Sequence, residues 1–184
     1  PNALNKIDSA NIGDSRAIII KEKNKYWTCK QLSRDHKPTE KDEANRIYQK
    51  GGHIEKYEDE EGNRKGPLRV WDNNGEGPGL AMTRSFGDVV GSLIGITCIP
   101  EIMEYEVKKE DKVIIIASDG LWEHMQNKEV TEIVKALYEK KDPDLIIKEL
   151  YKEAYDRWKE RNEGIDDTTI ICPFLKNMDK RGNK

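Results

Sequence analysis

Cysteine is scarce in this sequence, and the three cysteines present form no closely spaced pair. Because Cys29, Cys98 and Cys172 are odd in number and far apart, the sequence disfavours both a disulfide framework and a cysteine–histidine zinc site. Unpaired cysteines are typical of a reducing compartment, so we expect the cytoplasm or the nucleus. The sequence also lacks any run approaching the ~20 apolar residues that a membrane span needs, so we expect no membrane partner.

An excess of positive charge is missing as well. The 184 residues include 32 lysines and arginines and 35 acidic residues, which gives a net charge of −3. This balance offers no basic surface for a phosphate backbone, so we expect no nucleic-acid partner. No signal peptide is visible, and the chain opens on Pro1 rather than on methionine. We therefore expect an excised piece of a longer protein, with any targeting signal upstream.

What the sequence does contain is a series of β-branched runs separated by turns. Residues 10–21 predict a strand, a tight turn and a second strand, and residues 26–32 predict a third strand that completes an antiparallel meander. Further strands are predicted over residues 99–107, 112–118 and 168–175. Because strands and helices do not alternate regularly, the pattern favours an α+β fold with antiparallel pairing over a doubly wound parallel sheet.

Three helices are predicted from their caps and apolar spacing. The first is capped by Thr39, buries Ile47 and Tyr48 and stops at the glycines 51–52. Asn127 caps the second helix, and Pro143 opens the third. Residues 56–79 are polar, glycine-rich and weakly periodic, which indicates a mobile surface excursion.

Acidic residues stand at the ends of three predicted β elements. Asp119 follows a run of four β-branched residues, Asp166 precedes the apolar pair 170–171, and Asp14 lies in the tight turn between strands. Carboxylates that converge in one cleft repel one another, and a divalent cation relieves that repulsion. Ligands that are all oxygen suit Mg²⁺ or Mn²⁺. The alternative is that each acid simply forms a turn, which is a common role for Asp beside Gly.

Six motifs occur in order over residues 10–175, and they carry a resemblance to a known family: ANIGDSRAII, LSRDHKP, GPGLAMTRSFGD, PEI, IIIASDGLWE and DDTTIIC. The sequence resembles the metal-dependent protein phosphatases of type 2C, which act on phosphoserine and phosphothreonine. The resemblance implies an antiparallel β-sandwich flanked by helices, an αββα arrangement, here incomplete. It also implies a centre of two, or even three, Mg²⁺ or Mn²⁺ ions at one end of the sandwich.

The resemblance assigns roles to particular residues. Asp119 and Asp166 match metal ligands of the family, while Asp14 and Glu123 match residues of a third, weaker metal position. At 167 an aspartate stands where the family usually has asparagine, and at 123 a glutamate stands where many members have aspartate. Arg84 and Asp88 fall within the flap, a variable subdomain beside the cleft that we place at about 56–98. There they order the flap or help substrate docking, or each forms a structural salt bridge, which is the role we favour for both.

The implied reaction is hydrolysis of phosphoserine and phosphothreonine in proteins, with a hydroxide bridging two Mg²⁺ or Mn²⁺ ions as the nucleophile. The family's N-terminal motifs, an Arg…Glu-Asp segment and DGHGG, have no match in this sequence. We therefore expect residues 1–175 to be the C-terminal portion of a catalytic domain, followed by a polar tail at 176–184. Alone, the chain should be inactive and prone to dimerise or exchange strands. The alternative is a noncatalytic phosphatase-like module that binds a protein partner.

Overall fold

The computed structural model describes residues 5–75, 77–162 and 164–175, and its backbone divides into two compact units. Unit 1 comprises Pro1–Ser9, Ser15–Ser33 and Ile102–Lys184, and unit 2 comprises Ala10–Asp14 and Arg34–Glu101. The predicted polar tail at 176–184 lies outside the described residues. Within the part of the chain that is described, no helix is long and apolar enough to cross a membrane.

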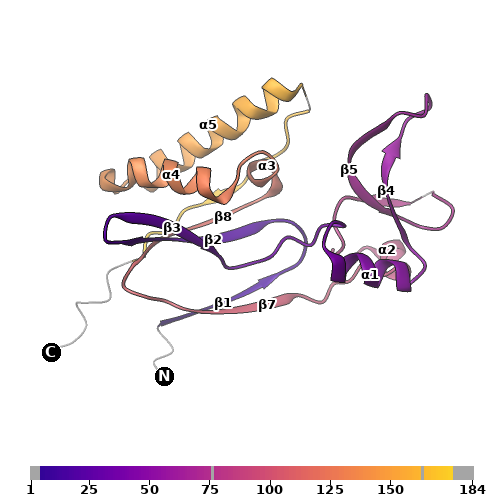
Figure 1. The fold of residues 1–184 in the computed structure, drawn as a ribbon, viewed down its shortest axis with the longest axis horizontal. Coiled ribbons are helices and arrows are strands. Elements are labelled where there is room, and N and C mark those ends of the chain that lie inside the picture. The colour runs from indigo at the N-terminus through magenta and orange to yellow at the C-terminus, as the bar shows by residue number, and fades with distance from the viewer. Residues whose placement is uncertain (1–4, 76, 163, 176–184) are drawn as a thin grey trace. The chain divides into compact units, whose positions relative to one another are not determined.

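Unit 1 is built on a four-stranded antiparallel sheet with the strand order β3-β2-β8-β9. A smaller sheet pairs β1 with β7. Figure 1 shows β1 and β7 along one side of the larger sheet and the helices α4 and α5 along the other. The strands are β1 (Lys6–Asn11), β2 (Arg16–Lys23), β3 (Tyr26–Gln31), β7 (Glu101–Glu106), β8 (Asp111–Ala117) and β9 (Ile170–Ile171).

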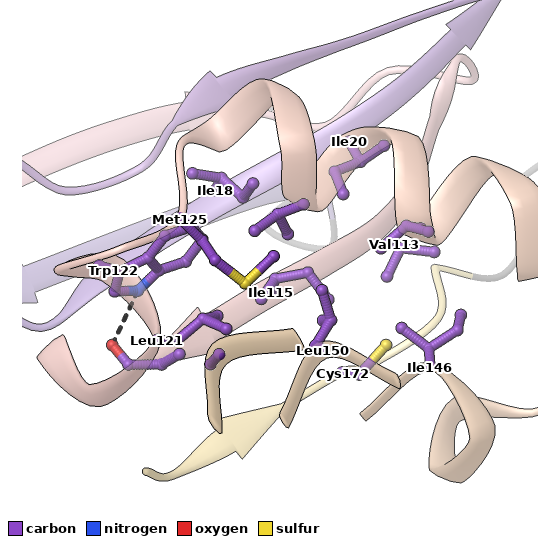
Figure 2. Close-up of a cluster of buried hydrophobic side chains, with 14 residues drawn as sticks. Ile18, Ile20, Val113, Ile115, Leu121, Trp122, Met125, Ile146, Leu150 and Cys172 are labelled. Carbon is purple, nitrogen blue, oxygen red and sulfur yellow. Dashed lines mark hydrogen bonds between the residues drawn. The ribbon is translucent and has the colours of Figure 1, made fainter. Parts of the chain in front are cut away.

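Successive side chains of β2 and β8 point to opposite faces of the sheet, and both faces are covered, which explains why both strands are so rich in β-branched residues. Ile18, Ile20, Val113 and Ile115 face the helices, where they pack with side chains from α3 (Asp119–Trp122), α4 (Asn127–Leu137) and α5 (Pro143–Arg161). Figure 2 shows this cluster, with Ile146 and Leu150 of α5 beside the sheet. A short 3₁₀ helix over Tyr138–Lys140 connects α4 to α5. Both faces of the sheet need apolar cover, so the runs are continuous rather than alternating.

The intervening residues of the same strands face a second core between the two sheets. Ile19 and Ile114 pack there with Leu32 and Tyr105, and the Tyr105 hydroxyl donates to the buried Asp111 carboxylate at 3.0 Å. Unit 1 therefore has a helix layer and two sheet layers. The predicted α+β sandwich with antiparallel pairing and flanking helices is confirmed, with one helix layer in the described residues.

Unit 2 has its own small core of Ile47, Val70, Ile94 and Ile96. Its three-stranded antiparallel sheet has the order β4-β5-β6. The strands are β4 (His53–Glu58), β5 (Arg64–Trp71) and β6 (Pro78–Leu80), and the helices are α1 (Lys41–Gln49) and α2 (Val89–Leu93). Strands thus occupy much of residues 56–79, where the sequence indicated none.

Several boundaries and pairings differ from the sequence-based expectation. The predicted antiparallel pairing of residues 26–32 with the strand after the turn is confirmed. The strand before the turn at Asp14 pairs with β7 instead of β2, so this part of the predicted meander is wrong and the turn links two sheets. The first helix starts after Glu40 rather than Thr39, and Tyr48 is exposed while Glu43 is buried. The second helix has its N-cap at Gln126, one residue early. The last strand is only two residues long, although a bridge from Phe174 to Val113 extends its contact with β8.

The helix predicted to open at Pro143 is confirmed, with four of its expected apolar residues buried: Ile146, Leu150, Ala154 and Trp158. All three cysteines are free, as expected for a chain without a disulfide framework. Cys172 belongs to the core of unit 1, and burial raises the pKa of its thiol to about 11.

Candidate metal centre

The carboxylate of Asp119 is carried by the first residue of α3, directly after strand β8. Two indoles fix this short helix. The Trp122 indole N–H donates to the carbonyl of Ala117 at 3.0 Å and to that of Arg16 at 3.1 Å, and the first of these bonds is the dashed line in Figure 2. The Trp158 indole N–H from α5 donates to the carbonyl of Gly120 at 2.8 Å. The backbone on both sides of Asp119 is therefore anchored in the core of unit 1.

Ser118 joins this helix start to the segment that carries Asp166. Its N–H donates to the Thr169 carbonyl at 3.1 Å, and its hydroxyl donates to the Asp167 carbonyl at 3.2 Å and accepts from the Thr169 N–H at 3.0 Å. These three bonds continue the β8–β9 pairing, in which Ala117 lies opposite Ile170. Consequently Asp119 and Asp166 belong to two segments held together at one end of the sheet.

Gly120 permits this close approach. A Cβ atom added at this position would lie 2.6 Å from the Asp167 carbonyl oxygen and would collide with the Thr168 hydroxyl. No side chain larger than hydrogen fits there without moving the 166–169 segment. The φ angle of Gly120 is one that other residues adopt, so backbone conformation does not require glycine here. The close contact between the two acidic segments does.

This contact predicts the effect of a single methyl group. We expect Gly120→Ala to lower the free energy of unfolding by about 1–3 kcal/mol, because the new Cβ must displace backbone rather than a flexible side chain. Gly164→Ala is the matched control, since a Cβ there meets no heavy atom within 4 Å. Urea titration of both variants measures the difference. We call the close contact of Ser118 and Gly120 with the 166–169 segment the interlock. Equal stability of the two variants would contradict the part of it that Gly120 makes.

The other two predicted ligands are placed differently. Glu123 is exposed and lies one helical turn after Asp119, since its N–H donates to the Asp119 carbonyl at 2.8 Å. A separation of four residues puts both side chains on one face of the helix. Asp14 is buried in the turn before β2 and belongs to unit 2. Its role as a ligand, like that of Glu123, stays a prediction.

The chemistry of the predicted ligands fits hard cations. Asp119 and Asp166 offer carboxylate oxygens, the ligands that Mg²⁺ and Mn²⁺ prefer. Asp166 also accepts the N–H of Asp167 at 2.8 Å. Among residues 5–75, 77–162 and 164–175, no three His, Cys, Asp or Glu side chains gather closely enough to hold a metal ion. A metal ion held by Asp119 and Asp166 would therefore need ligands from outside the described residues, and the role of these two aspartates as ligands stays a prediction.

A buried ion-pair cluster in unit 2 was missed by the sequence reading. Glu43 is 0% exposed and accepts from Arg84 at 2.5 Å, from Arg46 at 2.7 Å and from the Thr83 hydroxyl at 2.6 Å. The available signal was the position of Glu43, four residues before Ile47 on the buried face of α1. A charged residue inside an apolar stripe indicates a buried partner of opposite charge.

Arg84 and Asp88 have structural contacts in unit 2. Arg84 forms the predicted salt bridge, since its guanidinium holds Glu43 and also donates to the Ile99 carbonyl at 3.0 Å. Asp88 caps α2, where its carboxylate accepts the Gly91 N–H at 2.6 Å. For Asp88 a helix cap thus replaces the salt bridge that the sequence favoured. A role for either residue in substrate docking stays a prediction.

His36 is also structural. Its side chain is fully buried, and its Nδ1 accepts the Gly13 N–H at 3.2 Å. Burial, followed by the charge of Arg84, lowers the pKa of the imidazole, so the ring is neutral near pH 7. The neutral ring fastens the turn at Gly13 to the loop after β3.

The buried carboxylate of Glu43 predicts a loss of stability in acid. Burial by itself raises the pKa of this carboxyl, but hydrogen bonds from Arg46, Arg84 and Thr83 outweigh burial and hold the pKa well below its ordinary 4.5. The stabilising contribution is therefore complete above the unfolded pKa and is lost as the pH falls below it. We expect the urea midpoint of the wild type to fall more steeply from about pH 5 to about pH 3 than that of Glu43→Gln. Parallel pH profiles would contradict this.

Comparisons with known proteins extend these observations. The chain is 36% identical over 169 residues to "Probable protein phosphatase 2C 73" of Arabidopsis thaliana, and the match covers 90% of this chain and 43% of the relative. It is also 36% identical to "Probable protein phosphatase 2C 12" of Oryza sativa subsp. japonica, covering 90% and 42%. The chain thus spans less than half the length of these curated relatives.

The fold recurs in solved structures. A serine-threonine phosphatase 2C from Toxoplasma gondii superimposes with a TM-score of 0.75 at 24% identity, covering 94% of this chain and 55% of that one. A C. elegans sex determining protein gives 0.70 at 24% identity, covering 94% and 37%. The sequence model of the family described as Protein phosphatase 2C matches residues 3–162. By this match over most of its length, the chain belongs to the protein phosphatase 2C family.

Proposed function

We propose that this chain is part of a metal-dependent phosphatase that hydrolyses phosphoserine and phosphothreonine in proteins. The observation that carries the proposal is the interlock of Ser118 and Gly120 with the 166–169 segment, which holds two acidic segments at one sheet end. Membership of the protein phosphatase 2C family supports the reaction class. The carboxylate donors support Mg²⁺ or Mn²⁺ as the cofactor.

In this proposal Asp119 and Asp166 would hold the cations, with Asp14 and Glu123 at a third position. When bound, divalent cations of this kind acidify a water molecule and neutralise phosphoryl oxygens. The chain's own residues supply position and rigidity. Trp122 and Trp158 fix the backbone that carries Asp119, and Ser118 fixes the segment that carries Asp166.

We further propose that the chain alone does not complete the site. Its curated relatives are more than twice as long as the part that it matches, and two carboxylates are too few for tight binding of a divalent ion. A version that is extended upstream to the length of these relatives, called the extended protein below, should supply the remaining ligands. The chain alone should be inactive and should dimerise or exchange strands through surfaces that the missing part covers.

The test compares the chain alone with the extended protein. We would measure Mn²⁺-dependent hydrolysis of a phosphothreonine peptide, Mn²⁺ binding by titration calorimetry, and mass by light scattering. Turnover by the extended protein only supports the proposal, and turnover by the short chain shows that the upstream groups are dispensable. An extended protein that folds but neither binds Mn²⁺ nor hydrolyses the peptide would instead be a noncatalytic module that binds a protein partner.

A further inference from the structure

An open pocket of about 590 Å³ lies beside α3 in unit 1. Its walls come from the start of β2, the end of α3, the first turn of α4 and the last turns of α5. Glu123, which lies one turn after Asp119, is part of the wall. The pocket therefore adjoins the helix on which the proposed metal centre is built.

The lining of this pocket carries more positive than negative charge. Among the described residues, four cationic side chains and two carboxylates, Glu123 and Glu129, line it. Arg157 and Arg161 also line an adjoining pocket that contains three further acids, Glu153, Asp156 and Glu160. Glu129 is already held, because it accepts from Arg157 at 2.8 Å and from the Gln126 N–H at 2.8 Å. The carbonyl of His124, also in the lining, accepts a hydrogen bond from Arg157 at 2.6 Å. The cationic residues are Arg16, Lys128, Arg157 and Arg161.

These four cations differ in how firmly the protein holds them. Arg16 donates to the Asn127 side chain at 2.8 Å and lies over the Trp122 ring, 4.9 Å from its centre. Arg157 spreads its donors over Glu129, Glu153 and the His124 carbonyl. Lys128 and Arg161 are exposed, and within the described part of the chain neither makes an ion pair. Two cations thus form fixed walls, and two are available to a ligand.

We propose that this pocket binds an acidic side chain of the substrate polypeptide, a few residues from the phosphorylated serine or threonine. This assignment rests on the proposed phosphatase function, since it gives the pocket to the same substrate. Glu123 joins the pocket wall to the helix of Asp119, so a polypeptide whose phosphoryl group lies at Asp119 can extend along α3 to the pocket. A carboxylate on that polypeptide then meets Lys128 and Arg161. Exposed charges of this kind determine selectivity and association rate more than affinity.

The experiment uses the extended protein and two phosphothreonine peptides. One peptide carries glutamates two to four residues away on both sides, and the other carries alanines at the same positions. We expect the acidic peptide to be favoured in kcat/KM by about fivefold at low salt, with the preference fading as ionic strength rises. The double variant K128Q/R161Q should lose this preference and keep the wild-type rate on the alanine peptide. K152Q, an exposed lysine on α5 outside the pocket, is the matched control and should keep both.

Fluorescence anisotropy of an unphosphorylated acidic peptide provides a second readout that needs no turnover. Weaker binding by K128Q/R161Q than by K152Q is the expected result. Failure to hydrolyse either peptide would overturn the proposed function. The anisotropy measurement would still show whether the pocket binds the acidic peptide. If the alanine peptide is hydrolysed normally and the acidic preference is absent, or survives in the double variant, the pocket assignment is wrong.

Discussion

Asp119→Asn should lower kcat/KM of the extended protein on a phosphothreonine peptide by at least about 100-fold, because it removes a charge from the proposed cation ligands. The asparagine has nearly the same shape, so the buried indole contacts of α3 should survive and the protein should stay folded. Mn²⁺ affinity, measured by titration calorimetry, should fall in parallel with activity. This agreement separates loss of the metal from loss of the fold.

Asp167→Asn is the matched control for that substitution. Asp167 is exposed, and the contacts that it makes to the SDG segment go through its backbone carbonyl, which the substitution leaves in place. The family pattern that the sequence resembles has asparagine here. We therefore expect activity and Mn²⁺ affinity within about twofold of the wild type, since surface substitutions away from special contacts have small effects. If Asp167→Asn were as damaging as Asp119→Asn, the ligand would be misassigned.

Glu43→Ala should be the most destabilising single change in unit 2. It removes the carboxylate that pairs with Arg46 and Arg84 and leaves their guanidinium groups without it, and it opens a void where the side chain was fully buried. Breaking a buried pair from one side costs about 3–5 kcal/mol. Urea denaturation of the chain, with a probe in unit 2 such as Trp71 fluorescence, measures the loss.

The neighbouring Asp42 provides the comparison. Its carboxylate also binds an arginine, Arg34, at 2.7 Å, and that contact lowers its pKa to about 2. Its side chain is 61% exposed, however. Solvent screening limits such surface pairs to about 0–1 kcal/mol, so Asp42→Asn should have little effect. Similar losses for Asp42→Asn and Glu43→Ala would show that burial does not decide the strength of this cluster.

The sequence predicted elements that depend on local pattern. Pro143 and the apolar spacing after it define α5, and the β-branched runs define β2 and β8. Strand partners are not local, which is why the pairing of β1 with β7 was missed. Strands β4 and β5 of unit 2 are largely exposed and lack the alternation that marks a half-buried strand.

In the candidate site, too, local sequence pattern predicts some features, and contacts between distant residues determine the others. Asp119 and Asp166 could be selected because each adjoins an apolar run. The proximity of the two segments that carry them depends on contacts of Ser118 and Gly120, and the hydrogen bond from Ser118 to Asp167 spans 49 residues of sequence. No spacing rule predicts such a contact. Glu43 was overlooked because a charged residue on a helix is ordinarily assigned to the solvent side.

Strand β9 has a kinetic consequence for the proposed site. Its ladder with β8 is two residues long, continued by the bonds of Ser118 on one side and the bridge from Phe174 to Val113 on the other, and it lies at the edge of its sheet in the described part of the chain. Short edge segments open by local unfolding far more often than the whole domain unfolds. Opening of this strand would carry Asp166 away from Asp119 while the core under α5 stays intact. The residence time of a bound ion would then be set by fraying of one short strand, independently of global stability.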